Sequence, residues 1–203
     1  MKLYYKAGAC SLASHIALEE IGRPYEIEAV DTAAGKTAGG DDFRAINPKG
    51  YVPALKLENG DVLTEGAAIL QVLADGAPEA ELAPKIGDPA RAKMLEHLVF
   101  VSSELHKAFS PLFRATSTDE DKAAAREAVA VKLDHIETEL SDGRAYLIGD
   151  QFTIADAYLF VVTNWANFTG IDLAGWPKLA AYVGRVASRP ASQAALRAEG
   201  LLQ

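Results

Sequence analysis

The order of hydrophobic periods in the N-terminal part of the sequence most constrains what this chain can fold into. Residues 2–6 have the composition of a short strand, and residues 11–22 place apolar side chains at the spacing of a helix. Residues 25–30 then alternate apolar and polar side chains, as a half-buried strand does. A polar, glycine-rich connection follows over residues 31–48. The segment therefore predicts a strand, a helix and a second strand before a long connection.

The next residues predict a hairpin and a helix. Two strand-like stretches, 54–57 and 61–65, flank Asn59-Gly60, a pair that strongly favours a tight hairpin turn. Residues 65–75 then return to helical spacing. The predicted order is βαβ followed by ββα, which is the order of a thioredoxin-like α/β domain over residues 1–76.

The rest of the sequence reads as helical. Residues 77–88 carry proline, glycine and charge without periodicity, so we expect a linker there. Asp88-Pro89 has the form of an N-cap followed by a first helical residue. Thr153 and Asp156 have the spacing of a capping box ahead of an apolar run, which should be the buried core helix. We therefore expect a two-domain chain whose second domain, residues 89–203, is an all-α helical bundle.

Charge and cysteine usage narrow the class of protein. The chain has 203 residues, a formal net charge of −8 and no basic stripe, which argues against a nucleic-acid partner. It has no run of about 18 uncharged apolar residues, so we expect no membrane-spanning helix. Its single cysteine, Cys10, cannot form an internal disulfide, which fits a reducing compartment. We expect a cytoplasmic protein.

Cys10 lies where the first predicted strand gives way to the first helix. The N-terminus of a helix stabilises a thiolate through its dipole and its unpaired N–H groups. An inert, buried cysteine is the alternative. Three residues on, where a dithiol redox protein carries its second cysteine, stands Ala13. A disulfide of Cys10 therefore needs a partner from outside the chain, and a small thiol cofactor is the obvious candidate.

The chain resembles the bacterial beta-class glutathione S-transferases over essentially its whole length, in particular those of xenobiotic-degrading bacteria. The matching segments are KLYYKAGACSLASHIALEE, NPKGYVPAL, LTEGAAI, SSELHKAFSPLF, FTIADAYLF and LRAEGL. The resemblance implies glutathione as co-substrate, no metal, a small hydrophobic electrophile as second substrate, and a homodimer.

The resemblance also implies glutathione-binding residues in the first domain. Val52-Pro53 would carry a cis bond and leave the Val52 backbone to pair with the cysteinyl part of glutathione. Glu65 and Gly66 begin a helix, whose N–H groups suit a carboxylate while the Glu65 side chain suits an ammonium. An acidic first turn that only complements the helix dipole is the alternative for Glu65. Ser11 and Lys36 complete this set, although Lys36 stands one position after the lysine of many family members.

In the second domain, Val99, Ser103 and His106 are spaced to share one helix face. The resemblance implies that His106, catalytic together with Cys10, lies near the thiol with Lys107, as base or as hydrogen-bond donor. Ser103 and Glu104 would be contributed across the dimer interface. The electrophile pocket would be lined by Phe109, Leu112 and Phe113.

The function implied is a glutathione transferase that conjugates glutathione to hydrophobic electrophiles, with dehalogenation as one specialised form. A second mode is exchange with disulfides, in which Cys10 forms a mixed disulfide. Two alternatives stay open at this point. One is a non-catalytic carrier of glutathione and hydrophobic ligands, since a fold does not determine a function. The other is a glutathione-dependent peroxidase or redox sensor.

Overall fold

The computed structural model describes residues Met1–Leu202, and it divides into two compact units. Unit 1 comprises residues 1–83 together with the C-terminal segment from residue 188, and unit 2 comprises Pro84–Ala187. Unit 1 is built on a mixed sheet and unit 2 is helical, as the sequence predicts.

The sheet of unit 1 has five strands in the order β3-β2-β1-β4-β5. Its members are β1 (Lys2–Tyr5), β2 (Glu26–Asp31), β3 (Lys36–Thr37), β4 (Ala54–Lys56) and β5 (Val62–Thr64). β1 pairs parallel with β2 and antiparallel with β4, and the β4–β5 hairpin encloses Asn59-Gly60 as expected. The predicted βαβ and ββα halves are thus joined at the central strand.

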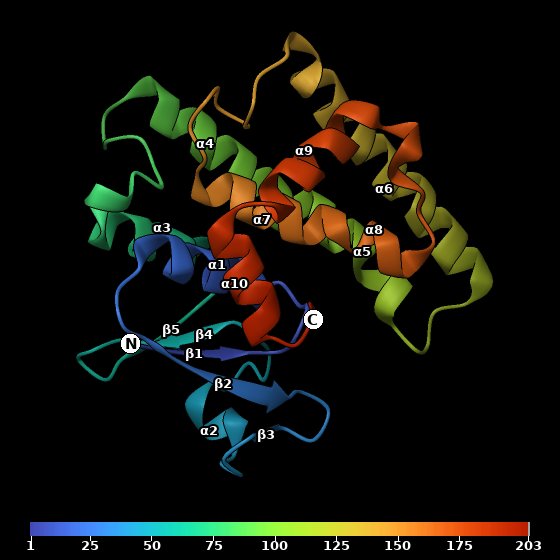
Figure 1. Cartoon of the computed structure of the whole chain (residues 1–203). Helices are drawn as coiled ribbons and strands as arrows, with labels where there is room; N and C mark the ends of the chain where they lie inside the picture. Colours follow the sequence, from blue (N-terminus) through green and yellow to red (C-terminus); the bar gives the residue numbers. More distant parts are fainter. Residues whose placement is uncertain (203) are drawn as a thin grey trace. The chain divides into compact units, whose positions relative to one another are not determined.

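Helices cover both faces of this sheet (Figure 1). α1 (Ser11–Ile21) and α3 (Gly66–Gly76) pack on one face, and α2 (Phe43–Ile46) lies on the other. Successive side chains of β1 point to opposite faces of the sheet. Leu3 is completely buried, and the ring of the next residue, Tyr4, lies 5.8 Å from the ring of Phe43.

The connection over residues 31–48 is more ordered than its composition suggests. It contains β3 and α2, neither of which periodicity predicts. A turn begins where the Asp31 carboxylate accepts hydrogen bonds from two following backbone N–H groups. Asp42 caps α2, and Phe43 is completely buried against the sheet. One buried aromatic side chain therefore fixes a segment too short to show a period.

The helices of unit 2 follow one another without strands. They are α4 (Pro89–Phe100), α5 (His106–Phe113), α6 (Asp119–Glu139), α7 (Ile154–Asn164), α8 (Ala166–Thr169) and α9 (Pro177–Ala187). A π-helical turn, Val101–Leu105, joins α4 to α5. Asp88 caps α4 by accepting from the Ala90 N–H, as predicted. Short 3₁₀ turns occur at Pro78–Ala80 in unit 1 and at Leu140–Asp142 and Leu173–Gly175 in unit 2.

The predicted core helix is α7, which is buried over nearly its whole length and runs through unit 2 (Figure 1). The predicted capping box forms at its start. The Asp156 carboxylate accepts from the N–H groups of Thr153 and Leu147, each at 2.8 Å, and from the Tyr182 hydroxyl at 2.9 Å. Its complete burial raises the pKa of Asp156.

The C-terminal helix α10 (Pro190–Ala198) differs from the expected division, which placed every residue after 88 in the helical domain. α10 packs against α1 and belongs to unit 1. An ion pair and a buried hydrogen bond hold it there: Arg189 contacts Glu20 at 2.6 Å, and the Glu199 carboxylate contacts Nδ1 of His15 at 2.9 Å. Helical periodicity identifies the element and says nothing about which unit it packs on.

Among residues 1–202, no helix combines the length and apolar character needed to cross a membrane. Within the same residues, no three histidine, cysteine or acidic side chains group closely enough to hold a metal ion.

Candidate active site

Cys10 occupies the N-cap position of α1, at the junction of strand and helix that the sequence predicts. Its side chain is partly exposed. The sulfur lies 3.5 Å from the carbonyl oxygen of Val52, which precedes Pro53. The Val52–Pro53 bond is cis, as the family resemblance implies. The thiol and the backbone next to the cis proline therefore form one local group in unit 1.

The loop that precedes Cys10 is held by side chains from α1 and from the C-terminal segment. The Ser11 hydroxyl is completely buried; it accepts from the Lys6 N–H at 3.2 Å and donates to the Lys6 carbonyl at 3.3 Å. Glu199 accepts from the Gly8 N–H at 3.0 Å. The Ser11 hydroxyl is therefore used within the loop, where it holds the backbone of Lys6.

Glu65 is the N-cap residue of α3 and has a backbone φ of +72°, which is rare for a residue with a side chain. Its carboxylate accepts hydrogen bonds from the Lys49 ammonium and, at 2.7 Å, from the Tyr51 hydroxyl. The hydrogen bond to Glu65, and then its negative charge, raise the pKa of Lys49. Lys49 and Tyr51 lie in the NPKGYVPAL segment, and no local sequence pattern marks them as site residues.

The side chain of Asn47 holds the same segment through hydrogen bonds. Its side-chain amide donates to the Tyr51 carbonyl at 2.7 Å, and its side-chain oxygen accepts from the Lys49 N–H. Asn47 is almost completely buried. The segment from Asn47 to Pro53 thus connects the two predicted parts of the site, because one end holds Glu65 and the other lies beside Cys10.

Lys36 does not join this group. It begins the edge strand β3, pairs with Asp31 in the register of the sheet, and is exposed. Within residues 1–202, no hydrogen bond or ion pair connects Lys36 to Cys10, Val52 or Glu65. The expected loop at this position is a short strand, which fixes where the backbone of Lys36 lies.

In unit 2, His106 is the first residue of α5 and directly follows the π-helical turn. Its Nδ1 lies 2.8 Å from the Tyr158 hydroxyl, and its ring packs edge-on against Trp165 at 4.8 Å between centroids. Burial, and then the positive charge of Lys107, lower the pKa of His106 from 6.5 to about 4. His106 is therefore a neutral imidazole at pH 7.

The three predicted pocket residues differ in exposure. Phe113 is 54% exposed and Leu112 is partly buried, so both can meet a ligand. Phe109 is completely buried. The rings of Phe109 and Phe113 both pack edge-on against Trp165, at 5.8 and 5.3 Å. Phe109 therefore packs against Trp165 from the buried side, and Trp165 is an aromatic neighbour that no local sequence pattern marks.

Ser103, Glu104 and Lys107 lie on the exposed side of the same helical stretch. The Ser103 hydroxyl donates to the Val99 carbonyl, and Glu104 pairs with Lys132 of α6 at 2.7 Å. Ser103 and Val99 are thus on one face, whereas His106 turns toward Tyr158. The π-helical turn advances the chain by a smaller angle per residue, which moves His106 off the face that α-helical spacing predicts.

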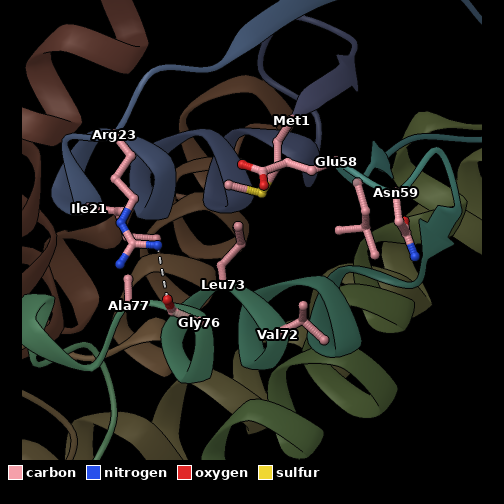
Figure 2. Close-up of a pocket in the computed structure, with 10 residues that line it drawn as sticks. Met1, Ile21, Arg23, Glu58, Asn59, Val72, Leu73, Gly76 and Ala77 are labelled. Carbon is pink, nitrogen blue, oxygen red and sulfur yellow. Dashed lines mark hydrogen bonds between the residues drawn. The ribbon is translucent and has the colours of Figure 1, made fainter.

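Figure 2 shows a pocket of about 310 Å³ elsewhere in unit 1, lined by residues of α1, α3 and the β4–β5 hairpin. Arg23 lies at one side and donates to the Gly76 carbonyl at 3.0 Å, while Met1, Val72 and Leu73 supply apolar surface. The ten lining residues include none of the predicted site residues. This pocket is therefore separate from the predicted site.

Comparison with known proteins assigns the chain to a family. Models of the glutathione S-transferase N-terminal domain and C-terminal domain match residues 7–75 and 100–190. Glutathione S-transferase GstA of Escherichia coli O157:H7 is 46% identical over 201 residues, which are 99% of this chain and 100% of the relative.

Two solved structures agree with this assignment over the full length of both chains. A sphingomonad glutathione S-transferase in complex with glutathione is 50% identical, with a TM-score of 0.95 and 100% coverage of each chain. The beta-class glutathione S-transferase of Sphingomonas chungbukensis is 48% identical, with a TM-score of 0.96 and 100% coverage of each chain. The chain belongs to the glutathione S-transferase family and is a bacterial glutathione transferase close to the beta class.

Proposed function

We propose that unit 1 binds glutathione through the group that joins Cys10, Val52 and Glu65. The observation that carries this proposal is the position of the Cys10 sulfur, 3.5 Å from the Val52 carbonyl at the start of α1. The backbone of Val52 can pair with the cysteinyl part of glutathione, so that the glutathione sulfur would lie close to the sulfur of Cys10.

The γ-glutamyl end of glutathione carries an ammonium and a carboxylate on one carbon. The Glu65 carboxylate suits the ammonium, and the N–H groups in the first turn of α3, beginning at Gly66, suit the carboxylate. Lys49 and Tyr51 hold the Glu65 side chain in place before any ligand binds, which lowers the ordering cost of binding. Lys36 remains a proposed contact for the glycine carboxylate.

Two modes of transfer follow. In conjugation, a thiolate of glutathione attacks a hydrophobic electrophile held against Leu112 and Phe113, with His106 and Lys107 near the sulfur. In exchange, the Cys10 thiolate attacks the glutathionyl sulfur of a mixed disulfide and releases the other thiolate. A second glutathione thiolate then attacks the Cys10 mixed disulfide, which yields oxidised glutathione and restores the Cys10 thiolate.

Intact mass spectrometry tests the exchange mode directly. Reduced protein is incubated at pH 7 with oxidised glutathione, with the Cys10→Ala variant as control. We expect one glutathione adduct on the parent and none on the variant. A folded parent that binds reduced glutathione and forms no adduct would refute the exchange mode. If conjugation by Cys10→Ala is then also undiminished, the reaction is conjugation alone.

We also propose a cytoplasmic homodimer with Ser103 and Glu104 near its interface. On unit 2, Val99 of α4 and Val131 of α6 are exposed apolar side chains, at 55% and 64%. The molar mass from light scattering at micromolar concentration shows whether the protein is a dimer, and a value of 21.6 kDa would refute the dimer.

A further inference from the structure

The imidazole of His106 is held by two residues that follow it by more than 50 positions. Tyr158 on α7 places its hydroxyl 2.8 Å from Nδ1, and it is only 4% exposed. Trp165 packs edge-on against the same ring, and Trp165 is itself packed against Phe109 and Phe113. The ring therefore has a fixed hydrogen-bond partner on one nitrogen and a fixed aromatic wall.

We propose that Tyr158 is a positioning residue that holds His106 in the tautomer with the proton on Nε2. His106 then acts as a hydrogen-bond donor through Nε2 and has no free lone pair with which to act as a base. The proposal concerns the site of the proposed function and rests on it for the identity of the acceptor, the glutathione sulfur.

The argument begins from which of the two groups donates. A neutral imidazole carries one proton, and the hydrogen bond made by one nitrogen decides where that proton resides. Phenols and imidazoles can each donate or accept. The phenol is the better acid, with a pKa near 10, and an imidazole nitrogen is a far better base than a phenol oxygen. The O–H of Tyr158 therefore donates to Nδ1, and the ring proton stays on Nε2.

The backbone around His106 supports a fixed orientation. Leu105 on one side and Phe109 one turn later are completely buried, so the start of α5 cannot rotate freely. The π-helical turn Val101–Leu105 ends directly before His106, and such turns are frequent at functional sites. In an unbroken α-helix, His106 would lie nearer the exposed face of Val99 and Ser103. The turn is what brings Nδ1 to Tyr158.

The second nitrogen remains available for a ligand. Among residues 1–202, Nε2 of His106 has no hydrogen-bond partner, and it is not one of the fully buried polar atoms. A thiolate is a good acceptor for an N–H group, so this edge of the ring is suited to an anionic sulfur. A base at this position would need the opposite tautomer, which the Tyr158 hydroxyl disfavours.

Nitrogen-15 NMR of histidine-labelled protein tests the tautomer without glutathione. Long-range ¹H–¹⁵N spectra at pH 7 distinguish a protonated ring nitrogen from an unprotonated one, and the signals that vanish in His106→Gln assign His106. We expect Nε2 protonated in the parent. We expect Tyr158→Phe to shift this population toward a mixture of both tautomers, and the control Tyr146→Phe, which alters a tyrosine beside Phe152, to leave it unchanged.

A parent spectrum with the proton on Nδ1 overturns the proposal, even if Tyr158→Phe fails to fold. An unchanged tautomer population in folded Tyr158→Phe overturns the role of Tyr158. Addition of reduced glutathione to the parent should then shift the Nε2 signal. If glutathione binds and this signal does not move, the donor role toward sulfur is wrong. If glutathione does not bind at all, the proposed function fails while the tautomer assignment stands.

Discussion

Removal of the Glu199 side chain should destabilise the protein and loosen the loop that carries Cys10. The Glu199 carboxylate is completely buried and joins two parts of unit 1. One oxygen contacts Nδ1 of His15 at 2.9 Å, and the other accepts from the Gly8 N–H at 3.0 Å. Glu199→Ala leaves the Gly8 N–H and the His15 Nδ1 without an acceptor. Gly8 and His15 lie two and five positions from Cys10 along the chain.

The expected loss follows from the environment of the two donors. His15 is completely buried, so its Nδ1 cannot exchange the lost partner for water. The Gly8 N–H is only partly buried, and water can replace part of its hydrogen bond. An unsatisfied buried group costs about 1–3 kcal/mol, and breaking a buried pair costs roughly 3–5 kcal/mol, so we expect the lower end, about 3 kcal/mol. For a chain of this length that is a decrease in Tm of roughly 6–12 °C.

Scanning calorimetry or circular dichroism measures this shift against two matched variants. Glu79→Ala removes an exposed glutamate that pairs with Arg23 on the surface, and should leave the Tm nearly unchanged because water replaces the lost partner. Glu199→Gln keeps the shape and should fall between the two. Its amide can donate to His15 only if the His15 proton moves to Nε2, which is buried without a partner. If Glu199→Ala melts within 1 °C of Glu79→Ala, on the order of 0.3 kcal/mol, the reasoning fails.

Three further predictions address other parts of the molecule. Asp156→Ala removes the buried acceptor of four donors, from Leu147, Thr153 (N–H and hydroxyl) and Tyr182, and thermal melts should show a loss of about 3 kcal/mol or more. The hydrogen bond from Lys2 lowers the pKa of Glu28 from 4.5 to about 2, so its stabilisation is present above pH 4.5 and is lost as the pH falls toward 2. Glu28→Gln should accordingly flatten the decline of Tm across that range. At Glu65, where φ is +72°, Glu65→Gly should be more stable than Glu65→Ala by about 1 kcal/mol in thermal melts, because glycine removes the backbone strain, while calorimetry should show weaker glutathione binding in both variants.

The parts of the fold that sequence reasoning predicts are those whose signal is contained in one element. The β4–β5 hairpin, the cap at Asp88 and the capping box at Thr153 each depend on residues within a few positions of one another. α2 and β3 escape prediction because each is too short to show a period. α10 is predicted as a helix but assigned to the helical domain instead of unit 1, because its packing on α1 depends on contacts with residues far away in the sequence.

The π-helical turn before His106 shows the same limit in another form. α-Helical spacing predicts that Val99, Ser103 and His106 share one face, and Val99 and Ser103 do. One wide turn, Val101–Leu105, is enough to move His106 toward Tyr158. Periodicity assumes a constant rotation per residue. A local change of helix type therefore changes the direction of every later side chain relative to the direction that periodicity predicts.

The reactive groups of this protein are visible in local sequence, whereas the groups that tune them are remote. Cys10 can be identified from its place at a helix start, yet the carbonyl beside its sulfur comes from a residue 42 positions away. The hydroxyl that orients His106 is 52 positions away, and the carboxylate that anchors Gly8 is 191 positions away. A nucleophile needs one residue type at one kind of position, but its protonation state is set by whatever the fold packs against it. Sequence reasoning can therefore name Cys10 and His106 as candidates, and only the packed structure shows which groups surround each of them.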